Sequence, residues 1–270
     1  EHFSALFSYQ GGGMTSYRYG GVEMLKGIPM PNFWRAPTDN DRGSAMPARY
    51  GQWKLASLYA KAAPERPEVT EEAGGVKVRF CYLLPTAPAA QCFLTYRVCP
   101  QGRVEVTLAY EPAQGLGDMP EFGVMLRLDA DYDRVRYYGL GPEENYADRC
   151  QGARLGIFAY KAGENVSGYL RPQECGGRTG VRWAEVMDYR GRGLRFAGDS
   201  MTFSALPYTP HQLEEALHQD ELPPIHYTII RAALAQMGVG GDDSWGARTH
   251  PEYLLPADKP LGFTFSFQGI

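Results

Sequence analysis

The chain has 270 residues, of which 44% are hydrophobic and 21% charged, and its formal net charge is −4. A chain of this length buries roughly three quarters of its unfolded surface, so it needs no disulfide or metal to fold. The mild acidity argues against a nucleic-acid or anionic-membrane partner, because both require clustered lysine and arginine. No apolar run approaches the roughly 20 residues of a membrane-spanning helix.

The cysteine content favours free thiols. The number is odd and no CxxC pair is present, so neither a disulfide framework nor a zinc site is indicated; the five are Cys81, Cys92, Cys99, Cys150 and Cys175. Buried free thiols favour a reducing compartment and therefore a cytoplasmic location. The chain begins at Glu1-His2-Phe3 without a methionine. We therefore expect a piece of a longer polypeptide rather than a separately encoded small subunit.

Most of the chain is predicted to be strand. Residues 1–30 are typical of a strand, a glycine turn at 11–13 and a second strand. Residues 50–63 favour a short helix that ends near Pro64. From Glu68 onward, apolar and polar residues alternate with period two between turns; the expected strands are 76–82, 103–110, 122–128, 134–138, 155–160, 181–189, 193–197, 202–206, 226–233 and 261–268.

One further helix is predicted at 210–218, with Thr209 as N-cap and Pro210 as first helical residue. No linker, low-complexity tract or internal repeat interrupts the chain. The pattern predicts a single all-β domain over residues 1–270, folded as a large antiparallel sandwich with one or two short helices.

The segment 238–245, Gly-Val-Gly-Gly-Asp-Asp-Ser-Trp, is the first candidate site. Its glycines permit tight turns or a close approach of the backbone, and its aspartates can hydrogen-bond to neighbouring amides. The loop delivers one tryptophan, Trp245, whose flat apolar face could stack on a sugar ring. The alternative is a hairpin whose tryptophan fills the core.

The second candidate is Asp39-Asn40-Asp41, followed by Gly43. The spacing does not match an EF-hand, because the glycine comes one residue early and no glutamate follows at the required place. Asx turns that hold a loop are one interpretation. The other makes Gly43 the pivot of a mobile loop over residues 43–52.

The carboxylates elsewhere are weaker candidates. Glu143 and Glu144 are adjacent in sequence and are therefore expected to be solvated or paired with Arg149, because a catalytic pair must face one bond from two sides. Arg178 and Arg182 could clamp Glu174, which favours structural support, and ligand binding by this segment is the alternative.

The five histidines form no metal-binding or catalytic motif, and no nucleophile elbow or phosphate loop is present. The chain thus offers no self-contained catalytic set.

Five segments together, in this order, resemble the C-terminal domain (domain 5, or small chain) of the bacterial β-galactosidases of glycoside hydrolase family 2. The resemblance covers nearly the full length; the segments are 33–41 (FWRAPTDND), 139–146 (GLGPEENY), 172–174 (PQE), 203–209 (FSALPYT) and 238–245 (GVGGDDSW).

This resemblance implies a β-supersandwich of galactose-mutarotase type that forms part of an enzyme. The glutamates of the retaining mechanism belong, in that family, to a separate barrel domain that this chain lacks. The family likeness makes Trp245 the sugar-stacking residue, supported by the loop residues Gly240, Gly241, Asp242, Asp243 and Ser244. It also implies a mobile active-site loop that comprises Arg35, Asp39, Asn40, Asp41 and Gly43.

The resemblance further implies magnesium and sodium (Mg²⁺ and Na⁺) for the complete enzyme, with no ligand assigned to this chain. The implied partners are the barrel and other domains of a β-galactosidase, its galactoside substrate, and further copies of the complete enzyme. One departure is Arg231-Ala232-Ala233-Leu234-Ala235, where family members often have an aspartate. A stand-alone aldose 1-epimerase and a carbohydrate-binding module remain the alternatives.

Overall fold

The computed structural model describes residues 2–243 and 245–270, and antiparallel strands dominate it. A small sheet has the order β1-β2-β3, with β1 at Phe3–Ser8, β2 at Gly13–Tyr19 and β3 at Val22–Glu23. The other strands form one sheet of 13 strands with the main order β12-β11-β13-β14-β16-β9-β8-β7-β5. Its strands are β4 Met30–Asn32, β5 Lys61–Ala62, β6 Glu68–Glu72, β7 Gly75–Leu84, β8 Ala90–Val98, β9 Val104–Glu111, β10 Glu121–Asp129, β11 Arg134–Gly141, β12 Arg154–Lys161, β13 Arg178–Met187, β14 Gly193–Leu206, β15 Tyr227–Gln236 and β16 Leu261–Gly269.

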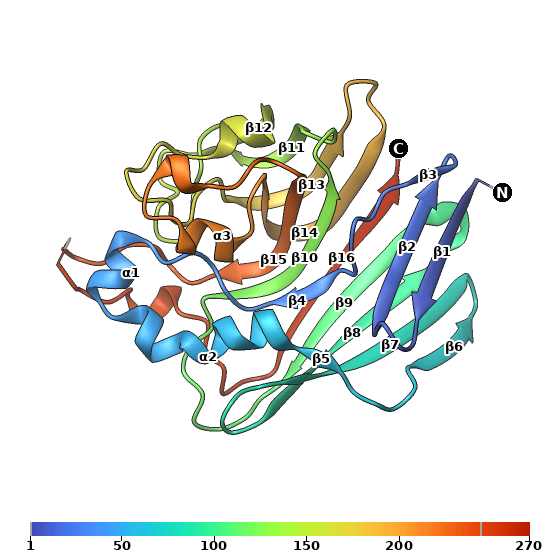
Figure 1. Cartoon of the computed structure of the whole chain (residues 1–270), viewed down its shortest axis with the longest axis horizontal. Coiled ribbons are helices and arrows are strands. Elements are labelled where there is room, and N and C mark those ends of the chain that lie inside the picture. Colours follow the sequence, from blue (N-terminus) through green and yellow to red (C-terminus); the bar gives the residue numbers. More distant parts are fainter. Residues whose placement is uncertain (1, 244) are drawn as a thin grey trace.

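The large antiparallel sheet curls over itself, which confirms the predicted all-β supersandwich (Figure 1). The fold depends on β14, because this strand changes partner along its length. Leu194–Ala197 pair with β16, whereas Thr202–Leu206 pair with β15, which in turn pairs with β10. The two strands predicted at 193–197 and 202–206 are therefore one continuous strand that joins the two halves of the sheet.

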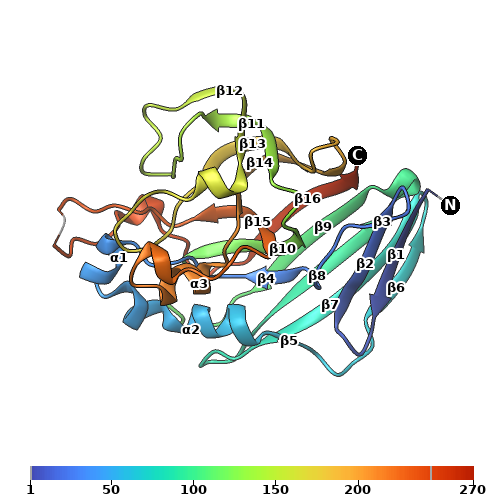
Figure 2. The same cartoon turned by 45° about the horizontal axis from the view of Figure 1, so that its top comes forward.

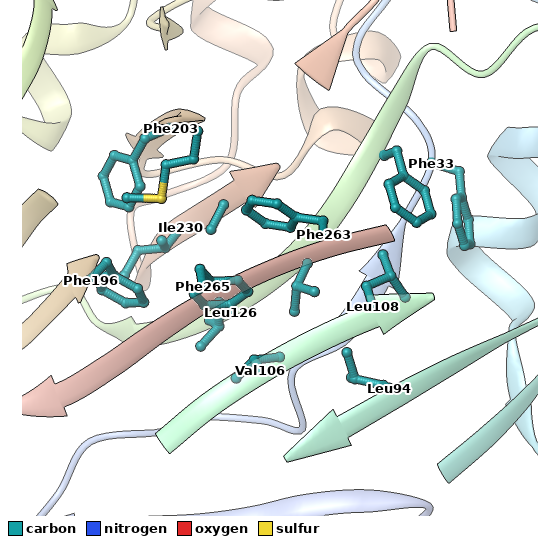
Figure 3. Close-up of a cluster of buried hydrophobic side chains, with 14 of the residues drawn as sticks. Phe33, Leu94, Val106, Leu108, Leu126, Phe196, Phe203, Ile230, Phe263 and Phe265 are labelled. Carbon is teal, nitrogen blue, oxygen red and sulfur yellow. The ribbon is translucent and has the colours of Figure 1, made fainter. Parts of the chain in front are cut away.

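The main core lies between these two halves (Figure 3). Val106 and Leu108 of β9 and Phe265 of β16 face Leu126 of β10 and Ile230 of β15, and all five side chains are at most 2% exposed. Alternate residues of β9 are buried, as the period-two pattern predicts for a strand with one face on the core. Burial of such side chains contributes about 1.5–3 kcal/mol each.

The small sheet packs on the part of the large sheet that contains β7, β8 and β16 (Figure 2). The ring of Phe7 on β1 lies 5.4 Å from that of Tyr96 on β8, and Tyr17 on β2 meets Phe267 on β16 edge-to-face at 5.1 Å. The predicted strand, glycine turn and strand over residues 1–30 are thus confirmed.

Among the described residues, three α-helices lie beside the sheet, α1 at Asp39–Gly43, α2 at Met46–Tyr59 and α3 at Pro210–Glu215. Short 3-10 helices occur at Pro100–Gly102, Ala162–Asn165, Gln219–Glu221 and Pro251–Tyr253. The N-cap of α3 is Thr209, as predicted, and its side chain accepts from the Gln212 amide. Helix α2 starts at Met46, four residues before the predicted helix. Most of the segment that was expected to be a mobile loop, residues 43–52, is therefore helical.

Helix α2 is fixed to the sheet through Trp53. Its ring lies 5.7 Å from Phe33 and 5.9 Å from Tyr110, and it is 1% exposed. None of the helices in the described ranges is both long enough and apolar enough to cross a membrane. All five cysteines are free, as predicted, and Cys92, Cys99 and Cys175 are buried.

Candidate functional site

The loop after β15 presents Trp245 to solvent. The side chain is 87% exposed, so the interpretation that this tryptophan fills the core is wrong. Asp243 organises the tip of the loop, because its Oδ1 accepts hydrogen bonds from the amides of Trp245, Gly246 and Ala247 at 2.9–3.0 Å. These three donors hold the pKa of Asp243 below its ordinary value. Ser244 lies outside the described residues.

The base of the same loop is held by Asp148. Its two carboxylate oxygens accept from the amides of Val239 and Gly240 at 3.0 and 2.8 Å. The first glycine of the loop, Gly238, lies so near that a Cβ there would be 2.6 Å from Asp148 Oδ2. At Gly241, a Cβ would be 2.4 Å from the Ala247 carbonyl oxygen. The sequence allowed two roles for these glycines, a tight turn or a close approach of the backbone. At Gly238 and Gly241 the structure shows the close approach.

The segment before and within α1 is anchored by Arg35, which is fully buried. Its Nη2 donates to both oxygens of Asp41 at 2.9 and 3.0 Å and to the Gly238 carbonyl at 2.9 Å. Nη1 donates to the Met237 carbonyl at 2.5 Å. Asp41 also completes a capping box with Thr38. One guanidinium thus connects α1 to the first residues of the Trp245 loop.

The remaining residues predicted for the mobile loop lie at the surface of α1. Asp39 accepts from Gln173 Nε2 at 3.0 Å, and Asn40 Nδ2 donates to the Val239 carbonyl at 3.3 Å. At Gly43, a Cβ would lie 3.1 Å from the carbonyl oxygen of Trp245. The two predicted segments, far apart in sequence, are therefore in contact at the end of the molecule where Figure 1 places α1.

Glu144 is bound by its neighbours rather than free for catalysis. Arg149 donates to it at 2.6 Å, as predicted, and so do Tyr169, Ser167 and the Gly176 amide. Burial alone would raise the pKa of Glu144, but these four donors outweigh it and lower the pKa. Glu143 is exposed.

The predicted clamp of Glu174 by Arg178 and Arg182 is wrong. Arg178 binds Asn165 and Tyr137, and Arg182 lies over the ring of Tyr138. The partner of Glu174 is instead Arg231, whose Nη2 donates to Glu174 Oε1 at 2.6 Å.

Arg231 is the centre of a buried charge cluster that the sequence did not reveal. Its Nη1 donates to Glu121 at 2.8 Å, and both of its carboxylate partners have fully buried side chains. Glu121 also accepts from Asn32 and Gln236. Burial raises the pKa of Glu121, and the positive charge of Arg231 opposes that rise. The departure from the family pattern over residues 231–235 drew attention to this strand, but it did not indicate the partners of Arg231.

Comparison with known proteins identifies the family. The family model of the β-galactosidase small chain matches residues 1–267. The chain is 43% identical over its whole length to a β-galactosidase of Halalkalibacterium halodurans, of which it covers 27%. It is 34% identical to a β-galactosidase small subunit of Latilactobacillus sakei, over 97% of this chain and 92% of that protein.

Solved structures share the fold at low sequence identity. A galactose 1-epimerase from Lactobacillus acidophilus superposes with a TM-score of 0.53 and 8% identity, over this entire chain and 91% of that one. A putative aldose 1-epimerase from Escherichia coli K12 gives a TM-score of 0.51 and 10% identity, over this entire chain and 96% of that one. The chain spans about a quarter of the first β-galactosidases that it matches. With the family model matched over almost its whole length, this chain belongs to the β-galactosidase small-chain family.

Proposed function

We propose that this chain is the C-terminal domain of a retaining β-galactosidase of glycoside hydrolase family 2 and completes its active site with Trp245. The observation that carries this proposal is an 87% exposed tryptophan on a loop fixed by Asp243 at its tip and Asp148 at its base. A large apolar side chain that a well-ordered loop holds in solvent is typical of a binding surface. In this proposal the catalytic glutamates lie outside this chain, which covers only about a quarter of the β-galactosidases that it matches.

The contact of α1 with the loop gives the residues 35–43 a supporting role in this proposal. The backbones of Gly43 and Trp245 are so close that a Cβ at Gly43 would require the loop to shift by a few tenths of an ångström. A movement of residues 39–43 would therefore change the position of the tryptophan. This is how we account for the mobile-loop role that the family resemblance implies for Gly43.

The catalytic part of the β-galactosidase is the partner that we propose for this face. Leu170, 93% exposed, lies two residues from Pro172, whose carbonyl accepts from Arg42 of α1 at 3.5 Å. Leu170 and Trp245 are the most exposed large apolar side chains in the described ranges, and the backbones of Pro172 and Trp245 both approach α1. Their exposure next to the proposed site favours contact with the remainder of the enzyme.

No metal site is assigned to this chain. Residues 2–243 and 245–270 contain no group of three or more His, Cys, Asp or Glu side chains that could hold a metal ion. Asp39 and Asp41 do not converge, because Asp41 is bound to Arg35 inside the protein. We therefore assign no ligand among the described residues to the magnesium and sodium that the family resemblance implies for the complete enzyme.

The test is Trp245→Ala in the assembled β-galactosidase, with lactose and an aryl galactoside as substrates. Loss of an aromatic surface for the sugar should weaken binding by about 1–3 kcal/mol, measured from kcat/KM. A matched control is Tyr189→Ala, which removes another exposed aromatic side chain and should leave the kinetics unchanged. Unchanged kinetics of Trp245→Ala with both substrates would refute the stacking role.

The chain alone should hydrolyse no lactose and should not accelerate mutarotation. Polarimetry on fresh α-galactose with the 270-residue chain distinguishes this proposal from the epimerase alternative. Mutarotation above the buffer rate would favour the epimerase. The likeness to solved epimerases does not decide the question, because it establishes the fold alone.

A further inference from the structure

Strand β12 is a free edge of the large sheet and lies at the margin of the molecule (Figure 2). On one side it pairs with β11 in a regular register, from Arg154 opposite Gly141 to Lys161 opposite Arg134, and no strand of the described residues pairs with its other side. Alternate backbone N–H and C=O groups of such a strand point away from the sheet. The strand has eight residues without a proline or a bulge, so a further strand can add to it.

The other margins of the large sheet carry features that discourage such pairing. Strand β4 has three residues, one of them Pro31, and β5 has two. Three of the five residues of β6 are glutamates. Strand β12, in contrast, has charges only at its two ends and exposes Leu155 by 47% and Ile157 by 63%. Short strands, proline and charges protect sheet edges from association. We therefore expect β12 to be covered when the protein works.

The sheet face beside this edge has the composition of a protein interface. Ile157, Tyr138 and Trp183 lie directly opposite one another on β12, β11 and β13. The guanidinium groups of Arg136 and Arg195 lie over the ring of Trp183, with their central carbons 5.7 and 4.7 Å from its centroid. Tryptophan, tyrosine and arginine are the residues most enriched in the energetically important parts of interfaces.

This surface is basic, although the whole chain carries a net charge of −4. Within β11, β12, β13 and residues 193–197 of β14, the only acidic residue is the buried Glu185, whereas the exposed basic residues are Arg134, Arg136, Arg154, Lys161, Arg182 and Arg195. Arg134 and Lys161 lie directly opposite each other, and like charges in that position destabilise a sheet. Glu164 is 3.7 Å from Lys161, but both side chains are more than half exposed, so this ion pair is weak. The surface therefore favours a partner with carboxylates.

A second copy of this chain fits the edge poorly. Antiparallel pairing of two β12 strands would bring the Arg154 end of each strand to the Lys161 end of the other, so like charges would meet at both ends. The rest of a β-galactosidase is a larger source, because this chain covers only about a quarter of the β-galactosidases that it matches. The edge also continues from the proposed site, since the connection from β11 to β12 contains Asp148, which holds the base of the Trp245 loop.

We propose that β12 and the sheet face beside it dock an acidic, extended segment from the part of the β-galactosidase outside this chain, which adds a strand to the free edge. Main-chain hydrogen bonds to β12 supply the affinity, and alternate side chains of the added strand contact Leu155, Ile157 and the basic ends of the edge. The proposal rests on the proposed function, because it takes this chain to be part of a β-galactosidase. It does not require Trp245 to contact a sugar.

Hydrogen exchange at residues 154–161 tests the proposal, with the complete β-galactosidase compared with the 270-residue chain at one pH and temperature. An added strand supplies acceptors for the outward amides of β12 and protects them from exchange. We expect exchange at these residues to be at least about 10-fold slower in the complete enzyme. Equal exchange in the two proteins would overturn the proposal. Protection in the isolated chain that grows with its concentration would also overturn it and assign the edge to a second copy.

Ile157→Glu places a carboxylate beside the acidic segment and should restore fast exchange at residues 154–161 in the complete enzyme. Because Ile157 is 63% exposed, the same variant should change neither the Tm nor the exchange of the isolated chain appreciably. Val69→Glu is the matched control, because it replaces a 49% exposed residue of the other edge strand β6 and should leave β12 protected. Retained protection in Ile157→Glu would contradict the proposal.

The charge of the partner is tested by reversal of the two opposed bases, Arg134→Glu with Lys161→Glu. In the complete enzyme this double variant should lose the protection of β12, since two added carboxylates repel an acidic segment. Unchanged protection would overturn the acidic partner. The isolated double variant, compared by urea denaturation with the wild type, verifies that the chain is folded.

These results are separable from those of the stacking proposal. Trp245→Ala should leave β12 protected in the complete enzyme. If Trp245→Ala has normal kinetics while β12 is protected, the stacking role fails and the docking surface stands. If Trp245→Ala weakens catalysis while β12 exchanges equally in both proteins, the docking surface alone fails.

Discussion

Replacement of the buried guanidinium by an apolar side chain, Arg231→Met, should destabilise the protein severely. Arg231 holds Glu121 at 2.8 Å and Glu174 at 2.6 Å, and the side chains of these three residues are at most 4% exposed. Removal of one member of a buried ion cluster leaves the other charges uncompensated, at a cost of about 3–5 kcal/mol. With about 2–4 °C per kcal/mol for a chain of this size, Tm should fall by about 6–20 °C.

The loss should depend on pH in a defined direction. Burial already raises the pKa of Glu121 in the native protein, and removal of the cation should raise it further. A carboxyl whose folded pKa exceeds its unfolded pKa contributes stability that is present below the unfolded pKa and lost as pH rises through the folded pKa. The free energy lost by Arg231→Met should therefore be larger at about pH 8 than at about pH 5.

Urea denaturation at both pH values measures this loss. Arg79→Met is the control, because Arg79 pairs with Glu68 at the surface, where the two side chains are 35% and 70% exposed. An exposed pair of this kind contributes about 0–1 kcal/mol. The reasoning is refuted if Arg231→Met costs no more than the control, or if its cost is the same at both pH values.

Two further predictions concern the Trp245 loop. Gly238→Ala places a Cβ 2.6 Å from a carboxylate oxygen of Asp148 and should cost about 1–3 kcal/mol in urea denaturation, whereas Gly152→Ala, with open space around it, should cost far less; equal losses would contradict the steric argument. The hydrogen bond from His250 to Asp242 at 2.7 Å raises the pKa of His250, so this contact stabilises the loop below the ordinary histidine pKa and is lost as pH rises through the folded pKa. Hydrogen-exchange protection factors at residues 238–250, which are corrected for the intrinsic rise of exchange with pH, should therefore fall between about pH 6 and pH 8 in the wild type but not in His250→Gln, and the idea fails if the two proteins respond alike.

The strands were largely predictable because each presents one face to the core, which imposes period two on the sequence. Strand β8 was missed although it carries the same signal, with Cys92, Leu94 and Tyr96 buried at alternate positions. The break predicted between 197 and 202 follows exposed polar residues at Asp199 and Ser200. Those residues do not end β14, because the strand changes partner there and its backbone stays extended.

The charge cluster was not predictable, because its pairs are set by strand register rather than by distance along the chain. Arg178 and Arg182 are near Glu174 in sequence, yet the actual partner, Arg231, is 57 residues away. Register places Glu121 of β10 opposite Gln236 of β15, which brings a carboxylate and its donors together inside the sheet. A single sequence contains no record of that register before the sheet is assembled.

The exposed Trp245 and the buried cluster belong to one structural unit. Strand β15 carries Arg231 and Gln236 and continues without interruption into Met237 and Gly238, whose carbonyls accept from Arg35. Two buried guanidinium groups thus fix the strand from which the loop emerges. A binding side chain is effective only when its support is rigid. The buried charges of Arg231 and Arg35 cost desolvation energy, but they hold the strand end from which the Trp245 loop emerges. We therefore expect Arg231→Met to disturb that loop as well as the core.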